Sequence, residues 1–228
     1  MYRELFDLEL QEEMTSFYLN HLSKLGILKT YKKGEEINPP HADEIYIVIK
    51  GALKEVLYST EGDEICFFRL PEGTIGGEMD YFDGYRTCVL MKAIKKSVVC
   101  SVHRDVLEKE LAKHPRIYRY FIHSITRKYR LLMLKMADDK FNDSTGKLAS
   151  TLLRFAAMQE GELKNDTTIE YRYTYTHEEL AKYLGCSRIT VTNVLNFFKE
   201  NNLIDVQNKH ITIKNVDGLK QYVKSLWF

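Results

Sequence analysis

The sequence predicts an α+β chain in which a small all-β domain is followed by a long amphipathic helix and a compact helical domain. Short apolar segments with a period of two, separated by glycines, run from Ile27 to about Val102. A helical period returns between Asp105 and Lys140. The stretch from Thr176 to Ile204 then reads as a helix, a tight turn and a second helix. These observations fix the predicted order of domains.

Composition excludes several classes of protein. At 228 residues and 44% hydrophobic content, the chain is long enough for two ordinary domains. Its 33 basic and 32 acidic residues give no strongly positive field, which argues against a non-specific nucleic-acid coat. Cys66, Cys88, Cys100 and Cys186 form no C-x-x-C pair, so we expect reduced thiols and neither a zinc site nor an iron–sulfur cluster. With no signal peptide or apolar span, we expect a cytoplasmic protein without a membrane partner.

The β domain should be a jelly roll or β-roll preceded by a helix over residues 2–25. Its expected strands cover residues 44–49, 52–58, 64–70, 86–91 and 97–102. A glycine-rich bend that includes Gly76, Gly77 and Glu78 lies between two of them, and Arg86 and Thr87 follow. Glycine N–H groups and an arginine can hold a phosphate, and a glutamate can accept a ribose hydroxyl. The alternative is that the glycines only turn the chain and that Glu78 pairs with Arg86.

The long helix carries apolar residues at alternating spacings of four and three, which is the pattern of a dimer seam. We expect a homodimer, with the helix flanks, Lys128 among them, in solvent. The alternative is a core helix lying on the β domain. The seam residues are Tyr118, Ile122, Ile125, Tyr129, Leu132 and Met136.

Local signals define the helix-turn-helix. Thr176 and Glu179 form a capping box, Gly185 can take the left-handed conformation that ends the first helix, and Ser187 can cap the second. Two short strands after Leu203 predict a wing beside the second helix. The alternative is an ordinary helical hairpin within a core. The residues on the polar face of the second helix, which should meet base edges of double-stranded DNA, are Arg188, Ile189, Thr192, Asn193 and Asn196.

Turn and capping residues from Asp143 to Gly146 mark a hinge. The expected organisation is therefore an effector-binding β-roll with its N-terminal helix (residues 1–110), a dimerisation helix (111–142), a hinge (143–146) and a winged helix-turn-helix domain (147–228).

This order resembles the CRP/FNR family of bacterial transcription regulators over nearly the whole chain. The likeness is most specific at Gly185 to Arg188 with Thr190-Val191, and at Asp143 to Leu153. It implies that Arg188 reads a guanine while Thr176, Ser187 and Thr190 hold phosphates. In the family's catabolite-activator pattern a glutamate and an arginine stand where this chain has Ile189 and Asn193, so the resemblance implies an altered, palindromic operator. RNA polymerase is a further expected partner if the protein activates transcription.

The resemblance also implies a small effector, nucleotide-like in class, bound by Gly76, Gly77, Glu78, Arg86 and Thr87. The positions that contact adenine in the catabolite-activator pattern align with Leu132 and Met133, whose side chains cannot make those polar contacts. These two positions argue against cAMP as the effector. The register of Arg86 also departs from the family pattern.

The residues leave two alternative functions. An effector-independent regulator of the same fold would have a closed pocket. A cupin-like metal enzyme would need histidine pairs, whereas the β region offers only His41 and His103. We expect no enzyme, no catalytic residue and no metal site.

Overall fold

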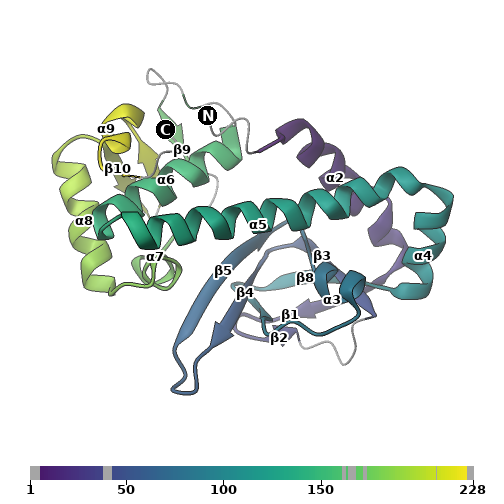
Figure 1. Ribbon diagram of the computed structural model, residues 1–228. Coiled ribbons are helices and arrows are strands. Elements are labelled where there is room, and N and C mark those ends of the chain that lie inside the picture. The colour runs from purple at the N-terminus through teal and green to yellow at the C-terminus, as the bar shows by residue number, and fades with distance from the viewer. Residues whose placement is uncertain are drawn as a thin grey trace. The chain divides into compact units, whose positions relative to one another are not determined.

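The structure is a computed structural model that describes residues 6–37, 43–160, 163, 168–171, 174–208 and 210–224 (Figure 1). These residues form two compact units. One comprises residues 9–129, and the other comprises the described residues from Arg130 onward together with residues 6–8. The division falls inside the long helix α5 (Tyr118–Phe141).

The first unit is a β-roll flanked by helices. Two four-stranded antiparallel sheets have the strand orders β1-β8-β3-β6 and β2-β7-β4-β5. The elements before α5 are α2 (Leu8–Asn20), η1 (Leu22–Leu25), β1 (Ile27–Tyr31), β2 (Glu36–Ile37), β3 (Glu44–Lys50), β4 (Ala52–Tyr58), β5 (Glu64–Pro71), β6 (Ile75–Gly76), α3 (Glu78–Asp83), β7 (Leu90–Ala93), β8 (Ser97–His103), α4 (Arg104–Lys113) and η2 (Pro115–Ile117).

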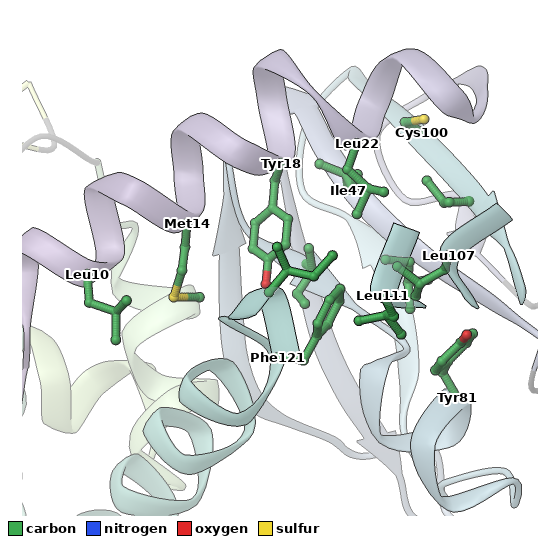
Figure 2. Close-up of a cluster of buried hydrophobic side chains, with 14 residues drawn as sticks. Leu10, Met14, Tyr18, Leu22, Ile47, Tyr81, Cys100, Leu107, Leu111 and Phe121 are labelled. Carbon is green, nitrogen blue, oxygen red and sulfur yellow. The ribbon is translucent and has the colours of Figure 1, made fainter. Parts of the chain in front are cut away.

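The core of this unit lies between the sheet that contains β3 and the helices that cover it. In Figure 2, Met14 and Tyr18 of α2 point toward the side chains that the sheet and other helices contribute, Ile47 and Phe121 among them. Ile47 pairs in register with Cys100 of β8, and both side chains are fully buried. Residues 45–48 are all buried, so β3 is covered on both faces. This double burial explains why its sequence is a continuous apolar run.

The second unit is a helical domain with a small sheet of order β10-β11-β9. Its elements after α5 are α6 (Ser144–Glu160), β9 (Ile169–Glu170), α7 (His177–Leu184), α8 (Arg188–Glu200), β10 (Ile204–Gln207), β11 (His210–Ile213) and α9 (Val216–Lys220). Leu148, Leu152, Leu180, Leu195 and Phe198 are at most 2% exposed and belong to its core.

Several boundaries differ from the sequence expectations. The expected helical run over residues 105–140 is divided into α4, η2 and α5, because Pro115 has no N–H and disfavours a helical conformation in the residue before it. The expected strand over residues 86–91 begins only at Leu90, and the short helix α3 precedes it. Both ends of α3 are set by glycines in the left-handed conformation, Gly77 (φ 83°) and Gly84 (φ 79°).

The expected hinge residues also differ in their placement. The break after α5 lies at Asn142-Asp143, and Gly146 is buried inside the first turns of α6. A Cβ on Gly146 would lie 2.6 Å from the carbonyl oxygen of Tyr222, so glycine is needed there for close packing against the C-terminal segment. The Asp143 carboxylate accepts a 2.9 Å hydrogen bond from the Gly146 N–H and thereby caps α6.

Expectations at the two chain ends lie partly outside the described residues. Residues 1–5 of the expected first helix are not described, nor are residues 172–173 and 225–228 of the expected DNA-binding domain. His41 falls in the same category. Within the residues that are described, no helix is both long and apolar enough to cross a membrane.

Candidate nucleic-acid interface and β-roll pocket

The start of α7 carries the predicted capping box. Thr176 Oγ1 accepts a 3.1 Å hydrogen bond from the Glu179 N–H, and the Glu179 carboxylate accepts a 2.7 Å bond from the Thr176 N–H. Gly185 then takes the left-handed conformation, with a φ of 67°. These contacts satisfy backbone donors at the start of α7 and turn the chain after its end. The predicted helix-turn-helix is therefore confirmed at its cap and at its turn.

Helix α8 separates an apolar face from a polar one. Its buried residues are Val191, Val194, Leu195 and Phe198. Ser187 caps the helix and accepts a 3.0 Å hydrogen bond from the Thr190 N–H. The outward side chains, all exposed, are those of Arg188, Ile189, Asn193 and Asn196.

The hydroxyl groups of this helix are already engaged by neighbouring groups. Thr190 Oγ1 lies 2.9 Å from Ser187 Oγ. Thr192 Oγ1 donates to the Arg188 carbonyl oxygen at 2.9 Å and lies 2.7 Å from Nδ1 of His177. A hydroxyl has one proton, so with that proton on the carbonyl the His177 ring must donate to Thr192. Thr192 therefore braces α7 against α8, and its oxygen has little capacity left for a base.

His177 was not among the residues predicted from the sequence. The sequence feature that could have pointed to it is its position directly after the capping residue Thr176, as the first residue of α7. The contact with Thr192, fifteen positions later, depends on the crossing of the two helices, which a local pattern does not specify.

The wing is an antiparallel hairpin of β10 and β11, with Val206 opposite Ile211. Asn208 in its turn has a positive φ of 49°, a conformation that asparagine tolerates better than most residues. Lys209 lies outside the described residues. Strand β9 extends this sheet through the pairing of Ile169 with Ile213.

Comparison with known proteins agrees with this architecture. Residues 146–222 match the family model of the Crp-like helix-turn-helix domain. The CRP-like cAMP-activated global transcriptional regulator of Mycobacterium tuberculosis is 28% identical over 178 residues, covering 78% of each chain. The cAMP-activated global transcriptional regulator CRP of Salmonella typhimurium is 25% identical over 173 residues, covering 75% of this chain and 81% of that protein. Residues 146–222 thus match the Crp-like helix-turn-helix family, and the chain is similar to CRP/FNR-type transcription regulators over about three quarters of its length.

The fold of the regulator also has solved counterparts. A mutant of CooA from Carboxydothermus hydrogenoformans superposes with a TM-score of 0.75 at 22% identity, over 93% of this chain and 94% of that one. The α+β fold expected from the sequence, with a β-roll, a long helix and a helix-turn-helix, is confirmed. The relatives are transcription regulators and not enzymes, as expected.

A small pocket opens on the β-roll of the regulator beside α3. Glu78, the first residue of α3, is 0% exposed, and its Oε1 atom lies 2.8 Å from Lys128 Nζ. Ser124 donates a 2.9 Å hydrogen bond to the same oxygen. Lys128 also lies 2.7 Å from Glu55 Oε1 of β4. We call Glu55, Glu78 and Lys128 the buried charge cluster.

The electrostatics of this cluster follow from burial and pairing. Burial alone would lower the pKa of Lys128, but Glu55 and Glu78 outweigh burial and raise that pKa above its ordinary value. Burial raises the pKa of Glu55 even though the Lys128 ammonium opposes this shift. Lys128 was expected on a solvated flank of the helix, and that expectation is wrong, since the residue is only 8% exposed.

The predicted effector residues are only partly brought together. Gly77, Glu78 and Thr87 line the pocket, and Gly76 is buried at the end of β6. Arg86 is exposed and is not among the described lining residues. The Glu78 carboxylate, for which pairing with Arg86 was the alternative expectation, pairs with Lys128. Leu132 and Met133 belong to the other unit, where Leu132 is partly buried and Met133 is exposed.

The predicted dimer seam is exposed along α5. Tyr118, Ile122, Tyr129 and Met136 are 40%, 61%, 63% and 72% exposed, whereas Ile125 and Leu132 are partly buried. Other residues of α5 are buried instead, namely Phe121, Lys128, Leu131, Leu134 and Asp138. The seam is therefore not the face that packs into the core of either unit.

Among the described residues, no group of His, Cys, Asp and Glu is arranged to hold a metal ion.

Proposed function

We propose that this regulator binds a palindromic operator as a homodimer, with α8 of each subunit in the major groove. The observation that carries the proposal is the outward face of α8, where Arg188, Asn193 and Asn196 present a guanidinium and two amides to solvent. Thr176, Ser187 and Thr190 lie at helix starts, where backbone N–H groups suit phosphate contacts.

The exposed seam of α5 supports the homodimer. Large apolar residues that repeat at spacings of four and three, and that are not packed in the core, suit pairing with the same helix of a second copy. A symmetric dimer would place two recognition helices about 34 Å apart, one turn of DNA. Selection from random DNA should recover two-fold-related half-sites, whereas a set of single, unrelated half-sites would contradict the dimeric arrangement.

We also propose that a small effector acts through the β-roll and shifts the population of DNA-binding conformations. Residues 1–110 would hold the effector, residues 111–142 the dimer helix, residues 143–146 the hinge and residues 147–228 the DNA-binding domain. CRP of Salmonella typhimurium is described as cAMP-activated. Here the described pocket lining carries four carboxyl groups, whereas its one ammonium is that of Lys128. This excess of negative charge disfavours the binding of a phosphate. The carboxyl groups are those of Glu44, Glu55, Glu78 and Asp80.

A second candidate, an effector-independent regulator, is favoured by the size of the pocket. Its volume is about 40 Å³, room for a few water molecules, and the Lys128 side chain supplies a cation from within the chain. Thermal denaturation with cAMP, other nucleotides and small cationic metabolites separates the two candidates. An effector raises the melting temperature and strengthens operator binding; full operator binding with no response to any compound favours the second candidate. We further propose that the protein acts in the cytoplasm and that it contacts RNA polymerase if it activates transcription.

A further inference from the structure

Ile189 is a large apolar residue in the exposed part of α8. It is the second residue of the helix and 73% exposed. Asn193 and Asn196 follow it at spacings of four and three, so these side chains form one stripe along the helix surface.

The packing of the domain does not require this isoleucine. The apolar face of α8 consists of Val191, Val194, Leu195 and Phe198, all buried. Single exposed apolar residues are common, so exposure alone indicates little. The position of Ile189 is what matters, because it lies in the first turn of the second helix, whose N-terminal residues reach base edges in helix-turn-helix proteins.

The hydroxyl groups near Ile189 already form hydrogen bonds within the protein, which limits the groups that this turn can present to a base. Thr190 Oγ1 is hydrogen-bonded to Ser187, and Thr192 Oγ1 is hydrogen-bonded to His177 and to the Arg188 carbonyl oxygen. Arg188 and Asn193 remain as polar groups on either side of Ile189. An isoleucine side chain cannot form hydrogen bonds, and the apolar group that a base pair presents in the major groove is the C5-methyl group of thymine.

We propose that Ile189 recognises the methyl group of one thymine in each half-site. The inference rests on the proposed insertion of α8 into the major groove and adds a specific base to it. Ile189 then contributes discrimination without a hydrogen bond, and Arg188 and Asn193 read the flanking bases.

Replacement of thymine by deoxyuridine tests this inference, because it removes the methyl group and keeps every base-pairing group. After selection of the preferred site, each thymine is replaced in turn, in both half-sites together, and affinity is measured for the wild-type protein. We expect one thymine per half-site to be sensitive, with a loss of about fourfold per half-site, the value for one buried methyl-sized group. The other thymines control for general effects of uracil on the duplex.

The Ile189→Ala variant supplies the second arm. Because the side chain is exposed, this variant should fold normally, bind the thymine site more weakly and show no further loss with uracil at the sensitive position. Asn196→Ala, on the same stripe, is the matched control and should keep the full uracil penalty.

Three results would overturn the inference. The first is a preferred half-site in which no thymine is sensitive to loss of its methyl group. The second is a loss of affinity on uracil substitution that persists in Ile189→Ala. The third is the absence of any uracil effect in the wild type, together with an equal loss of affinity for Ile189→Ala on the thymine and uracil sites. Failure to select any preferred site would instead overturn the proposed insertion of α8, and this inference with it.

Discussion

Arg154 of α6 and Asp138 of α5 form a buried ion pair at the junction between the long helix and the DNA-binding domain. Arg154 is 1% exposed and Asp138 is 3% exposed. Ser150 and Thr151 accept further hydrogen bonds from the guanidinium at 2.9 and 3.1 Å, and Asn142 donates to Asp138 at 2.8 Å. The last turn of α5 is thus fixed to α6 by charge and hydrogen bonds.

Removing one partner of this pair should be costly. Asp138→Ala leaves a buried guanidinium without its carboxylate, and we expect the free energy of unfolding to fall by about 3 to 5 kcal/mol. Urea denaturation measures the loss. The control is Asp139→Ala, which breaks a pair with Lys147 (2.8 Å) that is much more exposed than the Arg154–Asp138 pair, and it should cost at most about 1 kcal/mol. Equal effects of the two substitutions would contradict the assigned role of Asp138.

The dimer seam predicts an effect on association. Ile122→Glu places a charge at a 61% exposed seam position, so the subunit should remain folded while the homodimer dissociates at lower concentration. Analytical ultracentrifugation and operator binding should report the two losses together. Lys109→Glu, at an exposed position of α4, is the control for the added negative charge. A variant that stays fully dimeric would move the interface away from this face.

The buried charge cluster predicts a pH dependence with a defined sign. Lys128→Met leaves Glu55 and Glu78 without their cation, and stability at neutral pH should fall by about 3 to 5 kcal/mol. Burial already raises the pKa of Glu55 against the opposing Lys128 ammonium, so without that ammonium the pKa of Glu55 should rise further above its unfolded value; the folded state then binds more protons and its stability increases as the pH falls. Chemical denaturation between neutral and mildly acidic pH measures this slope. Adding Glu55→Gln and Glu78→Gln should recover much of the loss.

A second pH effect arises at Glu110. Lys113 and His21 lower the pKa of this carboxyl to about 2, through hydrogen bonds of 2.8 Å each. Since the unfolded carboxyl binds its proton at a higher pH, the contribution of Glu110 to stability is complete above the unfolded pKa and disappears as the pH falls toward about 2. Glu110→Gln should reduce the acid sensitivity of unfolding in this range. An unchanged acid limb would rule out this contribution.

Arg188 should behave as a base contact. We expect Arg188→Ala to cost about 1 to 3 kcal/mol at the preferred operator and less on random DNA. Fluorescence anisotropy with both DNAs measures the difference. Lys199→Ala, near the other end of α8, is the control and should leave the specificity ratio unchanged. An equal loss on both DNAs would assign Arg188 to a phosphate instead.

The helix-turn-helix could be predicted because its determinants are local. The hydrogen bonds and backbone conformations that define it span at most a few residues, so the spacing of these residues in the sequence determines their geometry in the fold. The residues are Thr176, Glu179, Gly185 and Ser187. The seam of α5 could be recognised as an apolar face for the same reason, since helical periodicity follows directly from the order of residues.

Only the tertiary structure decided which face of α5 is buried and which charges meet there. The sequence places Lys128 on α5, Glu55 on a strand and Glu78 after a glycine bend, but their approach within 2.8 Å depends on how the helix lies on the β-roll. Likewise, Thr192 is turned to His177 by the crossing of two helices. Periodicity defines the faces of an element, whereas long-range packing determines what each face meets.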